Sequence, residues 1–308
     1  MSVYVSKDSF EKREFAYFVG QCDFPYQDDY GTKKERKFFR ISEKGYRFPF
    51  AMWKEIYDEN PFPEGKKVAL ESSIKLTFRK GVDQKEVCQE AVDHLNDSGC
   101  CFLNIPTGVG KTSMAIVLAC SLKRKTIIVC GLTLTLSQWI EAFRLGTSIT
   151  PQYITTKSPI KSDVVVCTPH TFIKRSGDLK DYKTIICDEM HIETEKILTG
   201  LLKYNCEYLI GLTATLQRGD GLVGAIRLYF GETFIQRQDV KKGVAVYRVL
   251  TDYCPTPKTI RIGRKTRLDY TDLINQLCCN TERNGEITKH IFEYLSEGKT
   301  GLKLPPLI

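Results

Sequence analysis

Short apolar runs alternate with amphipathic stretches along the chain from about residue 76 onward. The apolar runs are rich in β-branched residues, which is typical of buried strands. Strands that are apolar throughout and are separated by helices predict a parallel sheet covered by helices on both faces, an α/β fold. The expected strands are Cys100–Asn104, Thr126–Cys130, Val164–Cys167, 184–187 and 208–212. The expected helices are 112–122, 134–143 and 281–297, and the segment 194–204 is expected to be helix or loop.

The first 75 residues differ from the rest of the chain in their high content of aromatic residues. Residues 4–62 contain 16 of the 33 aromatic residues of the chain. Disordered tails are poor in aromatic residues, so this segment is expected to be a smaller, aromatic-rich folded module. Within it, basic residues interleave with Phe38 and Phe39 over residues 33–40. This basic cluster has two interpretations, a nucleic-acid contact or a charged hairpin with a buried aromatic face, and the pattern favours the hairpin.

The differences in hydrophobic pattern and aromatic content divide the chain into three segments. We expect an N-terminal extension or accessory module over 1–75 and the α/β domain over 76–235. The last segment, 236–308, contains a strand-like run at 298–302 and ends in a Pro-Pro sequence that cannot continue a central strand. We therefore expect 236–308 to be a linker and the truncated start of a second domain.

Composition narrows the class of protein. The 308 residues are 42% hydrophobic and 27% charged, which is ordinary for a soluble chain of one or two domains. No run approaches the length of a membrane span, and the N-terminus lacks the apolar core of a signal peptide. We therefore expect an intracellular protein without a membrane partner, in the cytoplasm or nucleus, or in a virion if the chain is viral.

The cysteines and the net charge carry less information. The 12 cysteines include no CxxC pair, which favours reduced structural thiols over a zinc site or disulfides. The net charge of +8 is compatible with a polyanionic partner. A charge of this size does not establish such a partner without a supporting motif.

The sequence Ile-Pro-Thr-Gly-Val-Gly-Lys-Thr-Ser at 105–113 lies between an expected strand and an expected helix. Glycines let backbone N–H groups close around phosphate oxygens at a helix N-terminus, although Ile105 stands where the general phosphate-loop pattern has its first glycine. We expect Lys111 to reach the β- and γ-phosphates and the Thr112 hydroxyl to bind Mg²⁺. The expected nucleotide-binding residues are Pro106, Thr107, Gly108, Val109, Gly110, Lys111, Thr112 and Ser113.

Two carboxylates, Asp188 and Glu189, follow the expected strand 184–187. At the carboxyl edge of a parallel sheet, Asp188 can hold Mg²⁺. Glu189 can orient or deprotonate the attacking water. With Lys111, these are the expected catalytic residues, and ATP and Mg²⁺ are the expected cofactors.

The sequence Asp-Glu-Met-His at 188–191 resembles the DExH box of superfamily 2 helicases and translocases. The phosphate loop has that family's PTGxGKT form, and Leu-Thr-Ala-Thr at 212–215 resembles its motif III. The segment 212–221 and the aromatic N-terminal extension look like DNA-repair-type helicases and helicases of large DNA viruses of eukaryotes. The resemblance covers about residues 76–300. It implies a RecA-like fold and an ATP hydrolase that acts as a nucleic-acid helicase or translocase.

The resemblance also implies roles for residues outside the ATP site. The segments 129–139 and 167–169 resemble motifs Ia and Ib, which in the family contact the nucleic-acid backbone. We expect the nucleic-acid partner of this chain to be DNA rather than RNA. The segment 78–84 occupies the place of an adenine-recognition motif, in which Gln84 would read the adenine edge, although Gly81 and Val82 depart from the pattern. The implied coupling residues are His191, Thr213, Ala214 and Thr215. The implied nucleic-acid-binding residues are Gln138, Trp139, Thr168 and Pro169.

The sequence departs from the family in one respect. Nothing in it resembles the second RecA-like domain with its arginine fingers, and the GRxxR-like string within 261–267 is better interpreted as a basic surface loop. An arginine finger is worth orders of magnitude in rate, so intrinsic hydrolysis is expected to be weak. Three hypotheses follow. The chain is a truncated or split helicase, an ATP- and nucleic-acid-binding regulatory module with little turnover, or a half-motor completed by a separate chain that carries the second domain.

Overall fold

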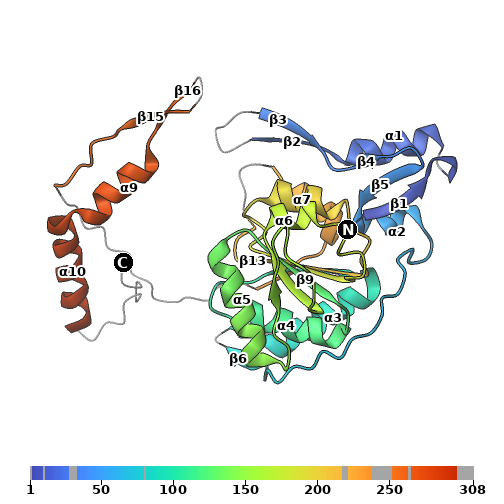
Figure 1. Cartoon of the computed structure of the whole chain (residues 1–308), viewed down its shortest axis with the longest axis horizontal. Coiled ribbons are helices and arrows are strands. Elements are labelled where there is room, and N and C mark those ends of the chain that lie inside the picture. The colour runs from blue at the N-terminus through green and yellow to red at the C-terminus, as the bar shows by residue number, and fades with distance from the viewer. Residues whose placement is uncertain are drawn as a thin grey trace. The chain divides into compact units, whose positions relative to one another are not determined.

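The computed structural model describes residues 2–9, 11–27, 33–79, 81–216, 221–237, 252–262 and 265–296. The chain forms two compact units, Met1–Val240 and Lys241–Ile308 (Figure 1). The strand-like run expected at 298–302, the Pro-Pro sequence and part of the segment 212–221 lie outside the described residues. None of the described helices is long and apolar enough to cross a membrane.

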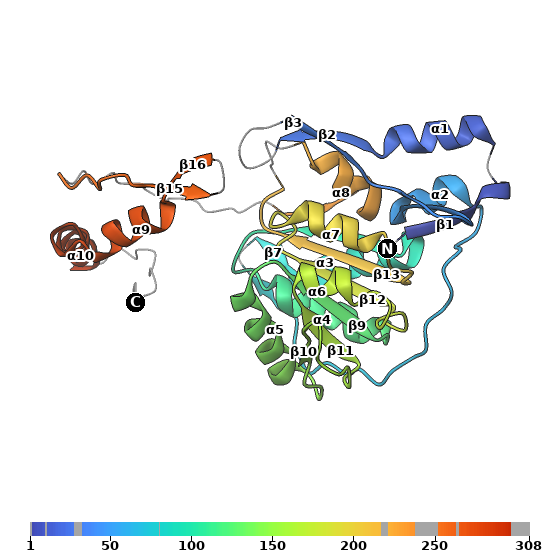
Figure 2. The ribbon, with the colours of Figure 1, turned by 45° about the horizontal axis from the view of Figure 1, so that its top comes forward.

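A sheet of seven parallel strands forms the centre of the first unit (Figures 1 and 2). In chain order the strands are β8 (Cys100–Asn104), β9 (Thr126–Cys130), β10 (Gln152–Tyr153), β11 (Val164–Cys167), β12 (Thr184–Asp188), β13 (Tyr208–Thr213) and β14 (Ile235–Gln236). Their spatial order is β10-β11-β9-β12-β13-β8-β14. Every residue of β9, β11 and β12 is buried, because helices cover both faces of the sheet. The predicted α/β fold is confirmed.

Two apolar cores lie on the two faces of this sheet, because successive side chains of a strand point to opposite faces. The helices on one face are α3 (Gln84–Ser98), α4 (Lys111–Leu122) and α5 (Thr133–Gly146). The helices on the other face are α6 (Pro169–Lys174), α7 (Thr194–Leu201) and α8 (Val223–Phe230). The first core contains Ile128 and Ile186, and the second contains their neighbours Ile127 and Ile185.

The aromatic N-terminal segment is folded. Its elements are β1 (Ser2–Ser6), η1 (Lys7–Ser9), α1 (Lys12–Gln21), β2 (Asp23–Gln27), β3 (Lys33–Lys37), β4 (Arg40–Ile41), β5 (Gly45–Pro49), η2 (Phe50–Met52) and α2 (Trp53–Ile56). Strands β2 and β3 form an antiparallel hairpin, and Phe38 directly after it is fully buried. The basic cluster thus lies largely in a charged hairpin that is followed by a buried aromatic residue, and a nucleic-acid contact of this hairpin is not tested. Phe38 and Phe48 lie in the same apolar core as Tyr229 of α8, so the segment is continuous with one face of the sheet.

A strap, residues 57–77, connects this segment to the short hairpin β6–β7 (Phe78–Arg79 and Val82–Asp83) that precedes α3. The strap has no helix or strand of its own and meets the α/β domain through isolated bridges, Lys67 to Arg124 and Ser72 to Thr147. These bridges hold it against the segments that precede β9 and follow α5.

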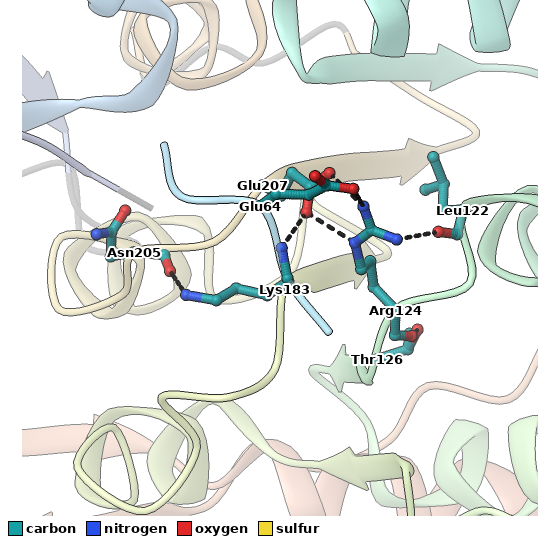
Figure 3. Close-up of polar contacts among 8 residues, drawn as sticks. Glu64, Leu122, Arg124, Thr126, Lys183, Asn205 and Glu207 are labelled. Atoms are coloured by element: carbon teal, nitrogen blue, oxygen red, sulfur yellow. Dashed lines mark hydrogen bonds and ion pairs between the residues drawn. The ribbon is translucent and has the colours of Figure 1, made fainter. Parts of the chain in front are cut away.

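A buried ion pair fastens the strap (Figure 3). The Arg124 guanidinium donates from Nε to Oε2 of Glu207 at 2.8 Å and from Nη2 to Oε1 at 2.9 Å. Arg124 also reaches Oε1 of Glu64 at 3.0 Å, and the Gly65 backbone N–H donates to Oε2 of Glu207 at 2.8 Å. Arg124 precedes β9 and Glu207 precedes β13, so the strap is fixed at the amino ends of the parallel strands.

The described residues of the second unit, 252–262 and 265–296, form a two-stranded antiparallel ribbon and two helices. They are β15 (Thr259–Ile262), β16 (Lys265–Leu268), α9 (Tyr270–Cys279) and α10 (Thr281–Ser296). Helix α10 confirms the helix expected at 281–297. The basic segment expected as a surface loop at 261–267 lies instead largely in the ribbon, because Ile260 pairs with Arg267 and Arg261 pairs with Thr266.

Candidate nucleotide-binding site

Three neighbouring strands end at the same edge of the sheet and carry the predicted ATP-site residues. The phosphate loop follows β8, Asp188 ends β12 and Thr213 ends β13. Strand β13 pairs with both β8 and β12, and the carboxyl ends of parallel strands meet at one edge. Residues far apart in the sequence are thereby brought together.

The phosphate loop leaves β8 and enters the N-terminus of α4. The Ile105 backbone N–H donates to the Thr213 carbonyl at 3.0 Å, which fixes the start of the loop to the end of β13. Gly108 and Gly110 have φ values of +78° and +96°, a left-handed backbone that favours glycine. A Cβ at Gly110 would also lie 2.5 Å from Nε2 of Gln84. The loop therefore presents glycine backbone at a helix N-terminus, where N–H groups lack helical partners and attract anions.

Lys111 is the first residue of α4, and its side chain folds back over the loop. Its Nζ donates to the carbonyl oxygens of Ile105 at 2.9 Å and Pro106 at 3.4 Å. Burial lowers the pKa of Lys111, and the charges of Glu189 and Asp188 oppose that shift. The ammonium group is thus held within the loop and in the electrostatic field of the two carboxylates.

Asp188 is 8% exposed, and both of its carboxylate oxygens accept hydrogen bonds. Oδ2 accepts from Nε1 of Trp139 at 2.7 Å, and Oδ1 accepts from the Glu189 backbone N–H at 2.9 Å. Burial raises the pKa of the Asp188 carboxyl, and the Trp139 hydrogen bond opposes this rise. The indole therefore orients the carboxylate and stabilises its charged form.

This contact corrects the role expected for Trp139. A direct nucleic-acid contact is wrong for this side chain, because it is 1% exposed and its only N–H donates to Asp188. Trp139 lies on the apolar stripe of α5 with Leu136 and Phe143, which are also buried. That helical spacing was the signal in the sequence for a buried position.

Glu189 follows Asp188 with a φ of +48°, which is uncommon for a residue other than glycine. Among the described residues no hydrogen bond reaches its buried Oε2 atom, although Nδ1 of His191 lies 3.2 Å away. The same Nδ1 lies 3.2 Å from Oγ1 of Thr213, whose hydroxyl donates to the Thr215 carbonyl at 3.0 Å. His191 thus links the carboxylate after β12 to the end of β13, and Ala214 lies within that linked segment.

Gln84 lies against the phosphate loop and is 3% exposed. Its Oε1 accepts from the Thr77 backbone N–H at 3.0 Å, and its Nε2 donates to the Val109 carbonyl at 2.5 Å. Both ends of the carboxamide are therefore bonded within the protein, between the strap and the loop. The contact with an adenine edge stays a prediction.

The other residues expected to contact nucleic acid differ in exposure. Gln138 is exposed on α5. Thr168 is half-buried, and its Oγ1 accepts from the Thr171 backbone N–H as the N-cap of α6. Pro169 is buried as the first residue of α6, a position that suits proline because no helical N–H is lost there. A contact through the Pro169 ring is therefore wrong, whereas contacts through Gln138 and Thr168 stay predictions.

The residues at this edge fit a nucleoside triphosphate with Mg²⁺. The glycine backbone at the start of α4 and the Lys111 ammonium suit phosphate oxygens. The half-buried Thr112 hydroxyl and the Asp188 carboxylate are oxygen donors of the kind that Mg²⁺ prefers. The Oε2 atom of Glu189, buried and without a hydrogen bond from the described residues, suits a water molecule next to the phosphates.

Replacing Trp139 by phenylalanine is expected to lower the free energy of unfolding by about 1–3 kcal/mol, because Oδ2 of the buried Asp188 loses its donor. The pKa of Asp188 should rise further, since the hydrogen bond that opposes its rise is removed. Denaturant unfolding followed by circular dichroism measures the stability. Trp53→Phe is the matched control, because it removes the indole hydrogen bond to the Ser98 carbonyl, away from the site. If Trp139→Phe and Trp53→Phe lowered the free energy of unfolding equally, the importance of the hydrogen bond from Trp139 to Asp188 would be contradicted.

Comparison with known proteins agrees with this geometry. Residues 77–218 match the protein family described as "Type III restriction enzyme, res subunit". The chain is 31% identical over 260 residues to "Putative helicase 161L" of Invertebrate iridescent virus 6, a match that covers 79% of this chain and 56% of that protein. It is 28% identical over 149 residues to the "DNA 3'-5' helicase XPB" of Kineococcus radiotolerans, covering 44% of this chain and 27% of that protein. The chain thus spans about half or less of the length of these relatives.

The fold is shared with a solved structure. The crystal structure of the UvsW helicase from Bacteriophage T4 matches with a TM-score of 0.51 at 19% identity, over 73% of this chain and 93% of that one. With the sequence matches to helicases, this shows that the parallel sheet and its helices have the RecA-like α/β fold of helicase structures.

Proposed function

We propose that the chain provides the first motor domain of an ATP-dependent nucleic-acid helicase or translocase of superfamily 2. One observation supports the proposal most strongly. A lysine, two carboxylates and a histidine lie together at one edge of the sheet, beside a glycine-containing loop; they are Lys111, Asp188, Glu189 and His191. ATP and Mg²⁺ are the proposed cofactors, and an intracellular site of action is part of the proposal. In this proposal residues 76–235 are the motor domain, 1–75 an accessory module and 236–308 a linker with the start of a second domain.

The proposed catalytic roles follow from the positions of the side chains. Lys111 leaves the carbonyls of its own loop and neutralises negative charge on the β- and γ-phosphates. Thr112 and Asp188 hold Mg²⁺, which when bound neutralises charge that develops on the phosphoryl oxygens. Glu189 orients the attacking water or accepts its proton through the oxygen that has no hydrogen bond from the described residues.

The contact between His191 and Thr213 supports the proposed coupling between ATP and nucleic acid. Any movement of Glu189 on hydrolysis would reach the end of β13 through the imidazole, because Nδ1 lies 3.2 Å from both side chains. The proposed contacts with the nucleic-acid backbone are Gln138, exposed on α5, and Thr168, which directly follows β11. DNA is favoured over RNA.

A second motor domain is expected to supply the arginine finger that fast hydrolysis requires. We propose that it comes either from the same polypeptide or from a separate chain, since the chain spans 56% of the viral relative. The proposal for the chain by itself is therefore ATP binding with weak turnover. A regulatory module that binds ATP with little turnover is the alternative.

The test replaces Glu189 by glutamine. This variant is expected to bind Mg²⁺-ATP like the wild type and to lose turnover by about a hundredfold or more, since the amide cannot accept a proton from water. Phosphate release measures turnover, and titration with a fluorescent ATP analogue measures binding. Glu193→Gln, an exposed position on the same loop, is the matched control and should retain turnover. Persistent hydrolysis in Glu189→Gln would remove Glu189 from the proposed role.

A further inference from the structure

One row of side chains crosses the three-stranded sheet β1-β5-β4 of the N-terminal segment. Tyr4 of β1 pairs with Arg47 of β5, and Arg47 pairs with Arg40 of β4. Directly paired residues of antiparallel strands lie on the same face of a sheet, so these three side chains lie side by side. The alternate residues Val3 and Phe48 point to the opposite face and are fully buried. On the face of the row, Tyr4 is 41% exposed, Arg40 is exposed and Arg47 is half-buried.

Two members of the row are like charges placed opposite each other. The Cβ atoms of such a pair lie about 4.5–5.5 Å apart, and like charges at this distance destabilise a sheet. Burial lowers the pKa of Arg47, and the charge of Arg40 lowers it further, against the opposing effect of Tyr4. The repulsion persists because arginine stays protonated in proteins. An anion bound between the two guanidinium groups would relieve it.

Neither guanidinium group is neutralised by a carboxylate among the described residues. Nη1 of Arg47 donates to Oγ of Ser2 at 3.1 Å, and the guanidinium carbon lies 5.7 Å from the centre of the Tyr4 ring. These contacts hold Arg47 in place, but they use one of its five N–H groups and leave its charge without a counter-charge. Arg40 forms no hydrogen bond or ion pair with any residue that the structure describes.

The arrangement fits a phosphate group of a polymer. A guanidinium presents its N–H donors in a rigid fork that matches phosphate oxygens, and two neighbouring forks can hold one phosphate between them. Because Arg40 is exposed, a single small anion would gain few contacts here in competition with water. A nucleic-acid backbone adds further phosphates beside the first, and arginine and tyrosine are among the residues that contact it in protein–DNA complexes.

We propose that Arg40 and Arg47 bind a phosphate of a nucleic-acid backbone on the exposed face of the sheet β1-β5-β4. The proposal rests on the proposed function, because it gives the N-terminal segment a contact with the nucleic acid on which the motor domain acts. The contact adds affinity that depends on charge and not on base sequence. It also accounts for a second arginine at a position where its charge weakens the sheet.

Two measurements on the full chain separate a binding role of Arg40 from a structural role. Fluorescence anisotropy gives the affinity for a labelled mixed-sequence DNA duplex at several salt concentrations, and denaturant unfolding gives the stability. For Arg40→Gln, the slope of log K against log salt is expected to become shallower by about 0.9, the value for one phosphate contact. Arg40→Glu should weaken binding further, whereas its denaturant midpoint should be no lower than that of the wild type, because a carboxylate then faces Arg47.

Arg13→Glu is the matched control, because it changes the net charge by the same amount at an exposed position of α1. Helix α1 packs on the opposite face of the sheet, where the Phe15 ring lies 4.3 Å from the Tyr46 ring. This variant should bind the duplex within about twofold of the wild type, since a charge away from the contact is screened by salt. Equal losses of affinity in Arg40→Glu and Arg13→Glu would overturn the arginine site and leave the proposed function standing.

Three further outcomes would also contradict the proposal. A fall in the denaturant midpoint of Arg40→Glu that parallels its loss of affinity would assign Arg40 a structural role. Competition by inorganic phosphate that exceeds that of sodium chloride at equal ionic strength would assign the site to free phosphate. A wild type that binds ATP but no nucleic acid would overturn both the arginine site and the nucleic-acid part of the proposed function.

Discussion

Replacing Lys111 by alanine is expected to abolish tight ATP binding and all turnover. The Lys111 ammonium is held inside the phosphate loop, 2.9 Å from the Ile105 carbonyl, and no other lysine or arginine lies in the loop at 105–113. Removing one partner of a desolvated charge pair costs about 2–5 kcal/mol of binding free energy, which is roughly thirtyfold to several thousandfold in affinity. Isothermal titration with Mg²⁺-ATP measures the loss.

Lys85→Ala provides the control for this variant. Lys85 is exposed in the first turn of α3, so its loss removes the same charge outside the phosphate loop. It should leave ATP affinity within about twofold of the wild type, since exposed charges are screened by solvent and salt. Unchanged ATP affinity in Lys111→Ala would contradict the assignment of 105–113 as a phosphate loop.

Replacing Glu207 by alanine is expected to cost about 3–5 kcal/mol of unfolding free energy, because it leaves the buried Arg124 guanidinium without its main partner. Arg124 and Glu207 are 4% and 8% exposed. Denaturant unfolding followed by the fluorescence of Trp53 and Trp139 reports on the first unit, which contains both indoles. The strap should also become more accessible to proteolysis, since Gly65 loses its acceptor.

Two comparisons make the Glu207 prediction specific. Glu64→Ala removes the exposed partner of the same guanidinium and should cost at most about 1 kcal/mol. Burial raises the pKa of Glu207, but hydrogen bonds from Arg124 and Gly65 outweigh it, and the net pKa lies below its usual range. The ionised carboxylate therefore stabilises the fold above about pH 4.5, and this contribution is lost as the pH falls through the lowered pKa. Equal stability of Glu207→Ala and the wild type at neutral pH would contradict the buried pair.

The sequence predicted the parallel sheet well because its strands are buried on both faces. Runs such as Thr126–Cys130 and Val164–Cys167 contain few polar residues, so their bounds are visible without knowledge of the partner strands. The phosphate loop could be recognised in the sequence equally well, since its glycines and its lysine lie in one short segment and bind the same phosphates. The position of the Asp-Glu pair in the site could be predicted from one assumption, that the carboxyl ends of parallel strands meet at one edge of the sheet.

The strap and the environment of Trp139 could not be predicted in the same way. Residues 57–77 have no hydrophobic period, and the ion pair that holds them joins residues 83 positions apart. For Trp139, similarity to a motif suggested a surface role, whereas packing on α5 placed the indole against Asp188. For Gln84, both hydrogen-bond partners come from other segments, the strap and the loop. Long-range packing decides each of these cases.

Steady-state hydrolysis of ATP by the purified chain tests the central claim most directly. It should be measured with and without Mg²⁺, and with single-stranded and duplex DNA and RNA. We predict slow, Mg²⁺-dependent hydrolysis that DNA increases and that Glu189→Gln abolishes. A chain that neither binds nor hydrolyses Mg²⁺-ATP, with any of these polymers, would contradict a motor-domain ATP site at the edge formed by β8, β12 and β13.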